Sequence, residues 1–249
     1  MKKLSIIIPC YNESKSIPLL LELFADGIGS RDIEVVLVDN GSFDETPAVL
    51  TALLPKYQFA KSVRVEKNQG YGFGILSGLA AGTGDFLGWM HADLQCDPAD
   101  VMRAYDIITK SPASEKLFVK GARYGRPLFD KFFTLGMSVF ETVYLQTGLW
   151  DINAQPNIFH RSFYQQWLNP PHDFALDLYV YCLAKKAGLR IVRFPVMFGP
   201  RQFGTSSWNS GLKARWKFIT RTIHFSTELK KNLPKAQFSA SKEKQKYDA

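Results

Sequence analysis

The sequence contains few cysteines and no long apolar run, and both absences exclude classes of protein. Its 249 residues include three cysteines, Cys10, Cys96 and Cys182, which form no C-x-x-C pair. A scattered, odd-numbered set of this kind supplies neither a disulfide framework nor a zinc site, so we expect a reducing compartment. No stretch approaches the roughly 18 consecutive apolar residues of a membrane-spanning helix.

The segment MKKLSIIIPCYN starts with two lysines, but Pro9 and Asn12 interrupt the apolar run after them and leave it too short for a signal peptide. We therefore expect a cytoplasmic protein. The length and composition are those of an ordinary globular chain. We expect one domain over residues 1–210, a helix over 211–233 and a disordered tail over 234–249, because the tail has little apolar content.

The formal net charge of +8 is not arranged as in a nucleic-acid-binding module. Basic residues gather between 213 and 246, and the base-stacking motifs of RNA-binding modules are not visible. We expect no nucleic-acid partner. An anionic substrate, an anionic lipid or solubility alone explains the charge equally well.

The first half of the chain repeats one pattern, in which a short apolar run ends at a polar turn and a segment of helical periodicity follows. The predicted strands are LSIIIP, IEVVLVD, SVRVEKN and DFLGWMH. Apolar strands separated by helices predict a parallel sheet covered on both faces, an α/β fold. Ligands of such sheets bind beyond the carboxyl ends of the strands, where the polar turns lie.

The second half is less regular. We interpret VKGARYGRPLFDK as a basic loop, residues 132–145 as a helix, HDFALDLYVYCLAKKAG as a helix that ends at Gly188, and LRIVRFPV as a strand. A further helix is predicted from Leu212 to about Asn232, with a narrow apolar stripe beside basic residues. Such a stripe suits an anionic membrane surface, and helix packing explains it too.

The turn VDNGSFDET is the first of two polar turns that could carry chemistry. Asp39 ends a predicted strand, Gly41 permits a tight turn, and Asp44 precedes a helix as a capping residue. As structure alone, this is an ordinary strand-to-helix turn. As a site, its first carboxylate could accept hydrogen bonds from a base or from ribose hydroxyls.

The segment FLGWMHADLQCDP is the second polar turn, and it places His91, Asp93 and Gln95 just past a buried strand. If the segment is extended, these alternate residues point to one side and can reach one ligand. A carboxylate and an amide oxygen suit Mg²⁺ or Mn²⁺ bound to a diphosphate, and imidazole suits Mn²⁺ better than Mg²⁺. The structural alternative is that Asp93 and Asp97 only cap the helix entered at Pro98.

Ordered motifs over about residues 4–210 resemble those of one family. SIIIPCYNES is similar to an opening strand and nucleotide loop, and VDNGSFDET to D-D-G-S-x-D-x-T. The long segment from NQGYGFG to HADLQCDP is similar to N-x-G-x-x-x-A-x-x-x-G followed by D-A-D-L-Q-x-x-P, VKGAR to G-S-R, and RFPVMFGPRQFGTSS to P-V-x-F-x-x-R-x-x-G-x-S-K. These motifs resemble family 2 glycosyltransferases of GT-A fold, most closely the polyprenyl-phosphate branch typified by dolichol-phosphate mannosyltransferase.

The resemblance implies inverting transfer from a nucleotide-diphosphate sugar, with UDP or GDP as the nucleotide, to a polyprenyl phosphate or a lipid-linked glycan. Mn²⁺ or Mg²⁺ would lie at the diphosphate. The implied nucleotide-binding residues are Pro9, Tyr11, Glu13, Asp39 and Asn68. The implied metal ligands are Asp93 and Gln95, with His91 beside them. The residues implied to meet donor or acceptor phosphates are Arg123, Arg126, Arg201 and either Ser206 or Ser207.

Three positions depart from the family pattern. His91 replaces the first aspartate of D-x-D, and Asn40 replaces the second aspartate of D-D-G-S. Trp208 follows Ser207 where the family has a lysine, which removes a phosphate-binding cation and puts the acceptor in doubt. The first departure weakens the metal assignment, although Asp93 and Gln95 match.

The nature of the acceptor decides whether a general base is needed. A phosphate acceptor is already anionic, so arginines suffice to hold it. A hydroxyl acceptor must lose its proton to a carboxylate within hydrogen-bond reach. The candidates are Asp177 and Asp173, which we place before the helix LYVYCLAKK, with Asp151 behind them.

Three other functions compete with sugar transfer. A nucleotidyltransferase also arranges carboxylates around a metal and a diphosphate, but it leaves the VDNGSFDET and PRQFGTSS matches unexplained. A dinucleotide oxidoreductase fits less well, because Ser77 occupies the third glycine position of GYGFGILS. A nucleotide- or glycan-binding protein without turnover stays open because of His91.

Overall fold

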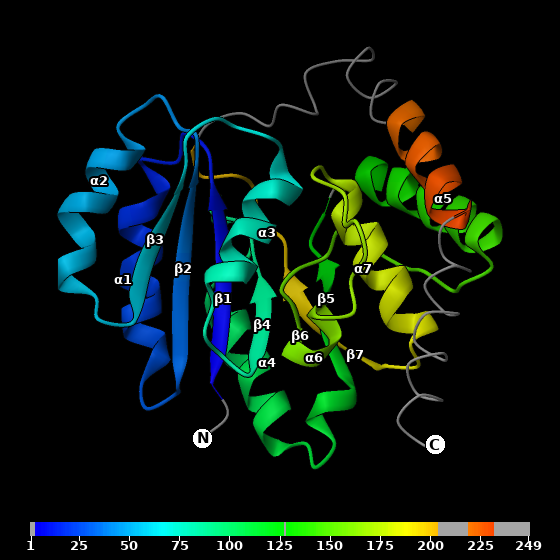
Figure 1. Cartoon of the computed structure of the whole chain (residues 1–249), viewed down its shortest axis with the longest axis horizontal. Coiled ribbons are helices and arrows are strands. Elements are labelled where there is room, and N and C mark those ends of the chain that lie inside the picture. The colour runs from blue at the N-terminus through cyan, green and yellow to red at the C-terminus, as the bar shows by residue number, and fades with distance from the viewer. Residues whose placement is uncertain (1–2, 127, 204–218, 232–249) are drawn as a thin grey trace, which may run out of the picture.

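Seven strands form a single sheet in the computed structural model, which describes residues 3–126, 128–203 and 219–231 (Figure 1). Their order across the sheet is β3-β2-β1-β4-β6-β5-β7. The strands are β1 Leu4–Cys10, β2 Ile33–Asn40, β3 Ala60–Val65, β4 Phe86–Trp89, β5 Leu117–Tyr124, β6 Asn157–His160 and β7 Arg190–Met197.

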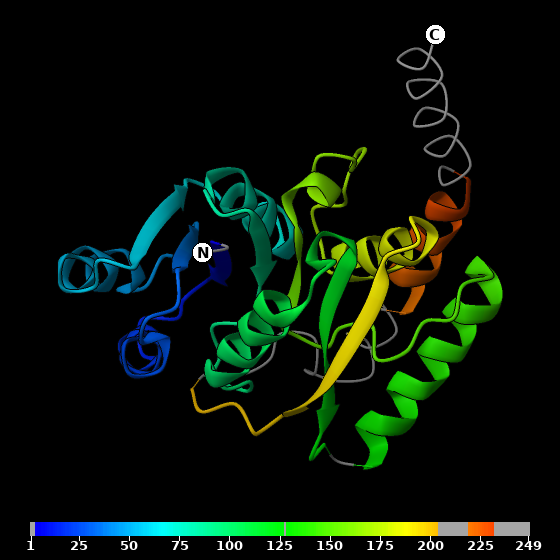
Figure 2. The same cartoon turned by 90° about the horizontal axis from the view of Figure 1, so that it is seen from below.

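Helices cover both faces of this sheet (Figure 2). The helices are α1 Ser16–Ile28, α2 Thr46–Leu53, α3 Tyr71–Ala81, α4 Ala99–Lys110, α5 Leu128–Leu145, α6 Arg161–Tyr164 and α7 Ala175–Lys186. Residues 219–231 are also helical. Short 3-10 turns, η1 Leu54–Lys56 and η2 Ser114–Lys116, precede β3 and β5.

The packing of the core explains why the strands are apolar throughout and do not alternate between apolar and polar residues. Ile6 and Ile8 of β1 face a cluster with α1, α2 and α4, whereas Ile7 faces a cluster with α3 and α7. All three isoleucines are fully buried. A strand that packs helices on both sides buries every side chain, so the predicted α/β fold is confirmed.

Strand β6 is an exception to the predicted parallel order, because it runs antiparallel to both β4 and β5. Strands β5 and β7 pair in parallel, as do β1 with β2 and with β4, and β2 with β3. Every strand except β6 therefore points the same way. Their carboxyl ends lie at one edge of the sheet, where ligands of such folds bind.

The prediction that VKGARYGRPLFDK forms a basic loop is wrong. Residues 117–124 form β5, and α5 begins at Leu128. The cationic residues suggested a solvated loop, but Lys120 is fully buried and donates hydrogen bonds to three oxygens. A buried lysine that is satisfied in this way is compatible with a central strand.

The predicted helix from Leu212 is described over residues 219–231, where it packs on α5. Ser226 Oγ donates a 2.7 Å hydrogen bond to Glu141 Oε1, and both residues are fully buried. Burial raises the pKa of the Glu141 carboxyl to about 7. Ser206, Ser207 and the predicted tail over 234–249 lie outside the described residues. No helix in the described part is long and apolar enough to cross a membrane.

Candidate active site

The loops after β1 and β2 are bound to each other, because these strands are parallel neighbours. Asn12, with φ of 57°, donates its backbone N–H to Ser42 Oγ at 3.0 Å. The backbone N–H of Glu13 donates to Thr46 Oγ1 at 2.9 Å. Asp44 Oδ1 accepts from the backbone N–H of Thr46, the first residue of α2, at 2.9 Å, whereas the N-cap position itself is Glu45. Both loops therefore form one fixed surface.

Asp39 lies at the end of β2 and is 2% exposed. Its Oδ1 accepts from the backbone N–H of Ser42 at 2.9 Å, and its Oδ2 pairs with Arg64. Arg64 is the β3 residue in register with Asp39. Our sequence analysis did not identify Arg64, although opposite charges near the ends of neighbouring strands were a usable signal. The pair fixes the carboxylate beside the surface predicted to hold a nucleotide.

Three other predicted nucleotide-binding residues surround this surface. Pro9 is paired with Val38 inside the sheet. Tyr11 is 45% exposed, and its ring meets the Phe43 ring edge to face at 5.9 Å between centroids. Asn68 Oδ1 accepts from the backbone N–H of Gly70 at 2.8 Å.

Gly41 is needed where the β2 loop passes Asn68. Its φ is +74°, and a Cβ there would lie 2.5 Å from the backbone nitrogen of Asn68. A larger residue would be strained by its backbone conformation and would also collide with the neighbouring loop. Gly41 thus keeps the β2 and β3 loops in contact.

The segment after β4 differs from the sequence prediction. Residues 92–96 bend, and Leu94 has φ of 58°, so His91, Asp93 and Gln95 do not project from an extended strand. Asp93 is 4% exposed, and its Oδ2 accepts from Arg201 Nη2 at 2.9 Å. Gln95 Nε2 donates a hydrogen bond to the carbonyl oxygen of Gly199 at 3.0 Å. Asp97 accepts from the backbone N–H of Ala99, the first residue of α4, at 2.8 Å, whereas the N-cap position of α4 is Pro98.

Glu13 brings a second carboxylate to the same place. Its Oε1 lies 3.7 Å from Arg201 Nη1. Burial raises the pKa of the Glu13 carboxyl, and the nearby Asp93 charge raises it further, while the hydroxyl of Ser16 and the guanidinium of Arg201 lower it. Two carboxylates from separate loops are therefore close enough to repel each other, and one cation lies beside both.

The oxygen donors at this place fit a divalent ion. Within the described part of the chain, no three histidine, cysteine, aspartate or glutamate side chains form a complete metal cage. Mg²⁺ and Mn²⁺ that bridge to phosphates need only one or two protein carboxylates, with the remaining positions filled by phosphate and water. Asp93 supplies such a carboxylate, and Gln95 carries an amide oxygen two residues on. The His91 ring lies 5.5 Å from that of Tyr71, and its role as a ligand stays a prediction.

Asp177 lies within the first turn of α7, which begins at Ala175, and therefore inside the helix predicted over HDFALDLYVYCLAKKAG and not in a segment before it. It is 3% exposed, and its Oδ1 accepts from Trp89 Nε1 at 3.2 Å and from Asn157 Nδ2 at 3.1 Å. Burial raises the pKa of this carboxyl, and the nearby Lys120 opposes the rise.

The other predicted base nearby, Asp173, is also engaged. Its Oδ1 accepts from the backbone N–H of Ala175, the first residue of α7, at 2.9 Å, and its Oδ2 lies 3.0 Å from Arg221 Nε. Burial lowers the pKa of Lys120, whose three acceptor oxygens lie 2.6–2.7 Å away, to about 7. Sequence analysis missed Lys120 because it was assigned to a loop.

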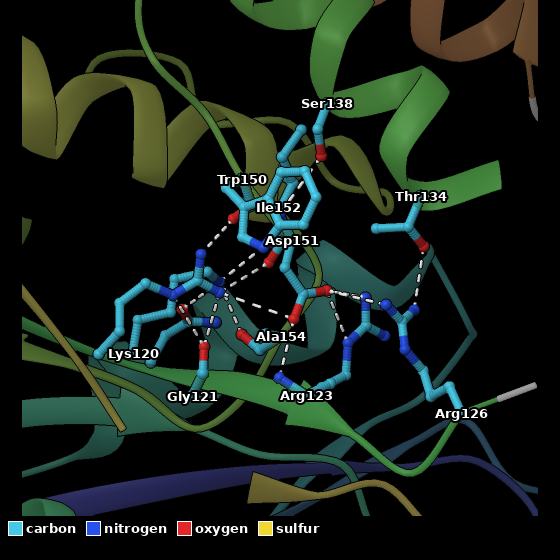
Figure 3. A network of polar contacts seen from close by, with 12 residues as sticks. Lys120, Gly121, Arg123, Arg126, Thr134, Ser138, Trp150, Asp151, Ile152 and Ala154 are labelled. Atoms are coloured by element: carbon cyan, nitrogen blue, oxygen red, sulfur yellow. Dashed lines mark hydrogen bonds and ion pairs between the residues drawn. The ribbon is translucent and has the colours of Figure 1, made fainter. Parts of the chain in front are cut away.

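A cluster of arginines surrounds Asp151, the third predicted base (Figure 3). Arg123 donates to Asp151 through Nε and its backbone N–H, each at 2.9 Å. Arg126 and Arg193 lie 3.6 and 3.7 Å from the same carboxylate. Burial alone would raise the pKa of Asp151, but Arg123 and then Arg126 outweigh it and hold the pKa below the usual range. Such a weak base is a structural anchor, and the three arginines leave a surplus of positive charge.

Comparison with known proteins agrees with the resemblance found in the sequence. The family model described as Glycosyl transferase family 2 matches residues 5–170. Undecaprenyl-phosphate 4-deoxy-4-formamido-L-arabinose transferases from Klebsiella pneumoniae and Sodalis glossinidius are 30% and 28% identical over 217 and 214 residues. Those alignments cover 84% and 83% of this chain, which spans 63% of the length of each relative. The chain belongs to glycosyl transferase family 2.

Solved structures confirm the GT-A fold. Glucosyl-3-phosphoglycerate synthase from Mycobacterium tuberculosis, in complex with UDP, superposes with a TM-score of 0.70 at 16% identity, covering 92% of this chain and 80% of that one. A mannosyltransferase from Pyrobaculum calidifontis, in complex with GDP-Man and Mn²⁺, gives a TM-score of 0.67 at 18% identity, covering 91% and 64%.

Proposed function

We propose that this protein is a metal-dependent, inverting glycosyltransferase that moves a sugar from a nucleotide-diphosphate donor to a polyprenyl phosphate or lipid-linked glycan. The convergence of Asp93 and Glu13 at the carboxyl edge of the sheet, beside Asp39, carries the proposal. Family membership and the names of the relatives support it. The fixed loops after β1 and β2 would hold the base and ribose.

The acidic and basic residues of the site would have different roles. Asp93 and Gln95 would hold Mn²⁺ or Mg²⁺, with His91 as a further predicted ligand. A bound divalent ion supplies Lewis-acid neutralisation of the diphosphate as it leaves. An acceptor oxygen would attack the anomeric carbon from the face opposite the leaving diphosphate, which inverts the configuration. Predicted contacts from Arg126, Arg201 and Ser206 would orient the phosphates.

The acceptor is better matched by a phosphate than by a hydroxyl. Asp177 and Asp173, the predicted bases, already accept hydrogen bonds or ion pairs within the described residues. Arg123, Arg126 and Arg193 share the single carboxylate of Asp151. A phosphate nucleophile needs cations and no base. We therefore place the polyprenyl phosphate first among the proposed acceptors.

Calorimetric titration with UDP and with GDP tests the donor half of the proposal. Each nucleotide is added with Mn²⁺, with Mg²⁺ or with excess chelator. We expect one nucleotide to bind in the presence of metal and to lose most of its binding heat in chelator, because the carboxylates alone repel a diphosphate. Binding that is equal with and without metal would contradict the roles given to Asp93 and Gln95.

A further inference from the structure

Arg201 forms an unusual bridge at the proposed metal position. Its Nη2 lies 2.9 Å from Asp93 Oδ2, and its Nη1 lies 3.7 Å from Glu13 Oε1. The two acids follow β1 and β4, and the arginine follows β7. One guanidinium thus lies between two carboxylates that come from separate loops.

The bridge is electrostatically necessary. Asp93 is almost fully buried, and the Glu13 side chain is 13% exposed. Neighbouring carboxylates that are removed from water repel each other strongly unless a cation lies beside them. Arg201 lies within 3.7 Å of both among the described residues, so its single positive charge offsets one of the two negative charges.

The same bridge leaves one donor of Arg201 unused. Arg201 Nε is buried and has no hydrogen-bond partner among the described residues. Arg31 in contrast binds Asp106 through both Nε and Nη2, each at 2.9 Å. Permanent buried pairs satisfy their donors. The unpaired Nε leaves Arg201 with a donor that another acceptor could use.

We propose that Arg201 is the resident counterion of the metal site and exchanges with the divalent ion. Without metal, the guanidinium partly neutralises Asp93 and Glu13, because one positive charge faces two negative ones. A divalent ion bound by Asp93 takes over that neutralisation, and the released guanidinium turns to a phosphate of the donor or acceptor. The nature of the ion and of the phosphates rests on the proposed function. Metal and Arg201 therefore compete when no phosphate is present.

The test is binding of Mn²⁺ alone to the full chain, measured by calorimetry and by the electron paramagnetic resonance signal of free Mn²⁺. Arg201→Gln removes the competing cation, so we expect it to bind Mn²⁺ about tenfold more tightly than the unmodified protein. Arg201→Lys retains the charge, and Arg31→Gln removes an ion pair elsewhere. Both should stay within about twofold of the unmodified protein.

Equal or weaker Mn²⁺ binding by Arg201→Gln would overturn the exchange, as would no Mn²⁺ binding by either protein. Arg201→Met, which keeps the apolar stem, replaces the glutamine variant if that one does not fold. Thermal unfolding provides a second readout, because Mn²⁺ should raise the melting temperature of the neutral variant more than that of the unmodified protein.

The nucleotide titration separates this inference from the proposed function. Metal-dependent nucleotide binding without tighter Mn²⁺ binding by Arg201→Gln would support the proposed function and contradict the exchange of Arg201 with the metal. Tighter Mn²⁺ binding by the variant would support the exchange. If the unmodified protein then bound neither UDP nor GDP, the proposed function would be contradicted.

Discussion

Replacing Asp93 with asparagine is expected to lower the rate of sugar transfer at least about 100-fold, which is the scale of losing one strong electrostatic contact in a transition state. Asparagine has nearly the same shape, but it cannot neutralise a metal or pair with Arg201 as an ion. The fold should persist, because an amide oxygen can still accept from the backbone N–H of Gln95, now 3.2 Å from Asp93 Oδ1. Initial rates at saturating Mn²⁺ and a thermal unfolding curve measure both effects.

Asp97→Asn is the matched control for this substitution. Asp97 is an exposed aspartate in the same loop, and its side chain accepts from the backbone N–H of Ala99, the first residue of α4. The amide oxygen of asparagine can accept the same hydrogen bond, so transfer should stay close to that of the unmodified protein. Retention of most of the transfer activity by Asp93→Asn would show that the metal role assigned to Asp93 is wrong.

Replacing Asp151 with asparagine is expected to lower the free energy of unfolding by about 3 kcal/mol, as when one partner of a buried ion pair is removed. The side chain is 4% exposed and lies beside the guanidinium groups of Arg123, Arg126 and Arg193. Asparagine fills the same space but leaves these three cations without a counter-charge. Urea denaturation monitored by circular dichroism measures the loss.

The pH dependence of this stabilisation follows from the pKa of Asp151. That pKa is lower in the folded protein than the usual 3.8, so the stabilisation is fully present above the unfolded value and is lost as the pH falls through the folded value. The difference between the two proteins should therefore be constant near neutral pH and shrink in acid. Asp26→Asn, at an exposed position on α1, should have little effect. A similarly small effect of Asp151→Asn would contradict the anchoring role.

The parts of the fold that were predictable depend on local patterns. Continuous apolar runs and the turns at Gly41 and Gly188 are enough to indicate β1 to β4, α7 and β7. Strand β6 was not predictable in the same way, since its antiparallel pairing with β4 and β5 depends on distant segments. Strand β5 was missed because a buried, fully bonded Lys120 looks like a loop residue in sequence.

The candidate site was predictable in its residue types and only partly in its geometry. Asp39, Glu13 and Asp93 do reach the carboxyl edge of the sheet. The idea that residues 91, 93 and 95 share a face failed because Leu94 adopts a positive φ, which bends the segment. The partner of Asp39, Arg64, could be inferred only from charges on neighbouring strands, and the partner of Asp93, Arg201, comes from a distant loop that no local pattern specifies.

The central claim is that the carboxyl edge of the sheet transfers a sugar from a nucleotide diphosphate. Its most direct test is incubation of the protein with UDP- and GDP-linked sugars, a polyprenyl phosphate and Mn²⁺, while nucleoside diphosphate and organic-extractable sugar are both measured. We predict that the two products appear in equal amounts with one donor class and disappear in chelator. Release of pyrophosphate from a nucleoside triphosphate, with no sugar in the lipid phase, would contradict the claim and indicate a nucleotidyltransferase.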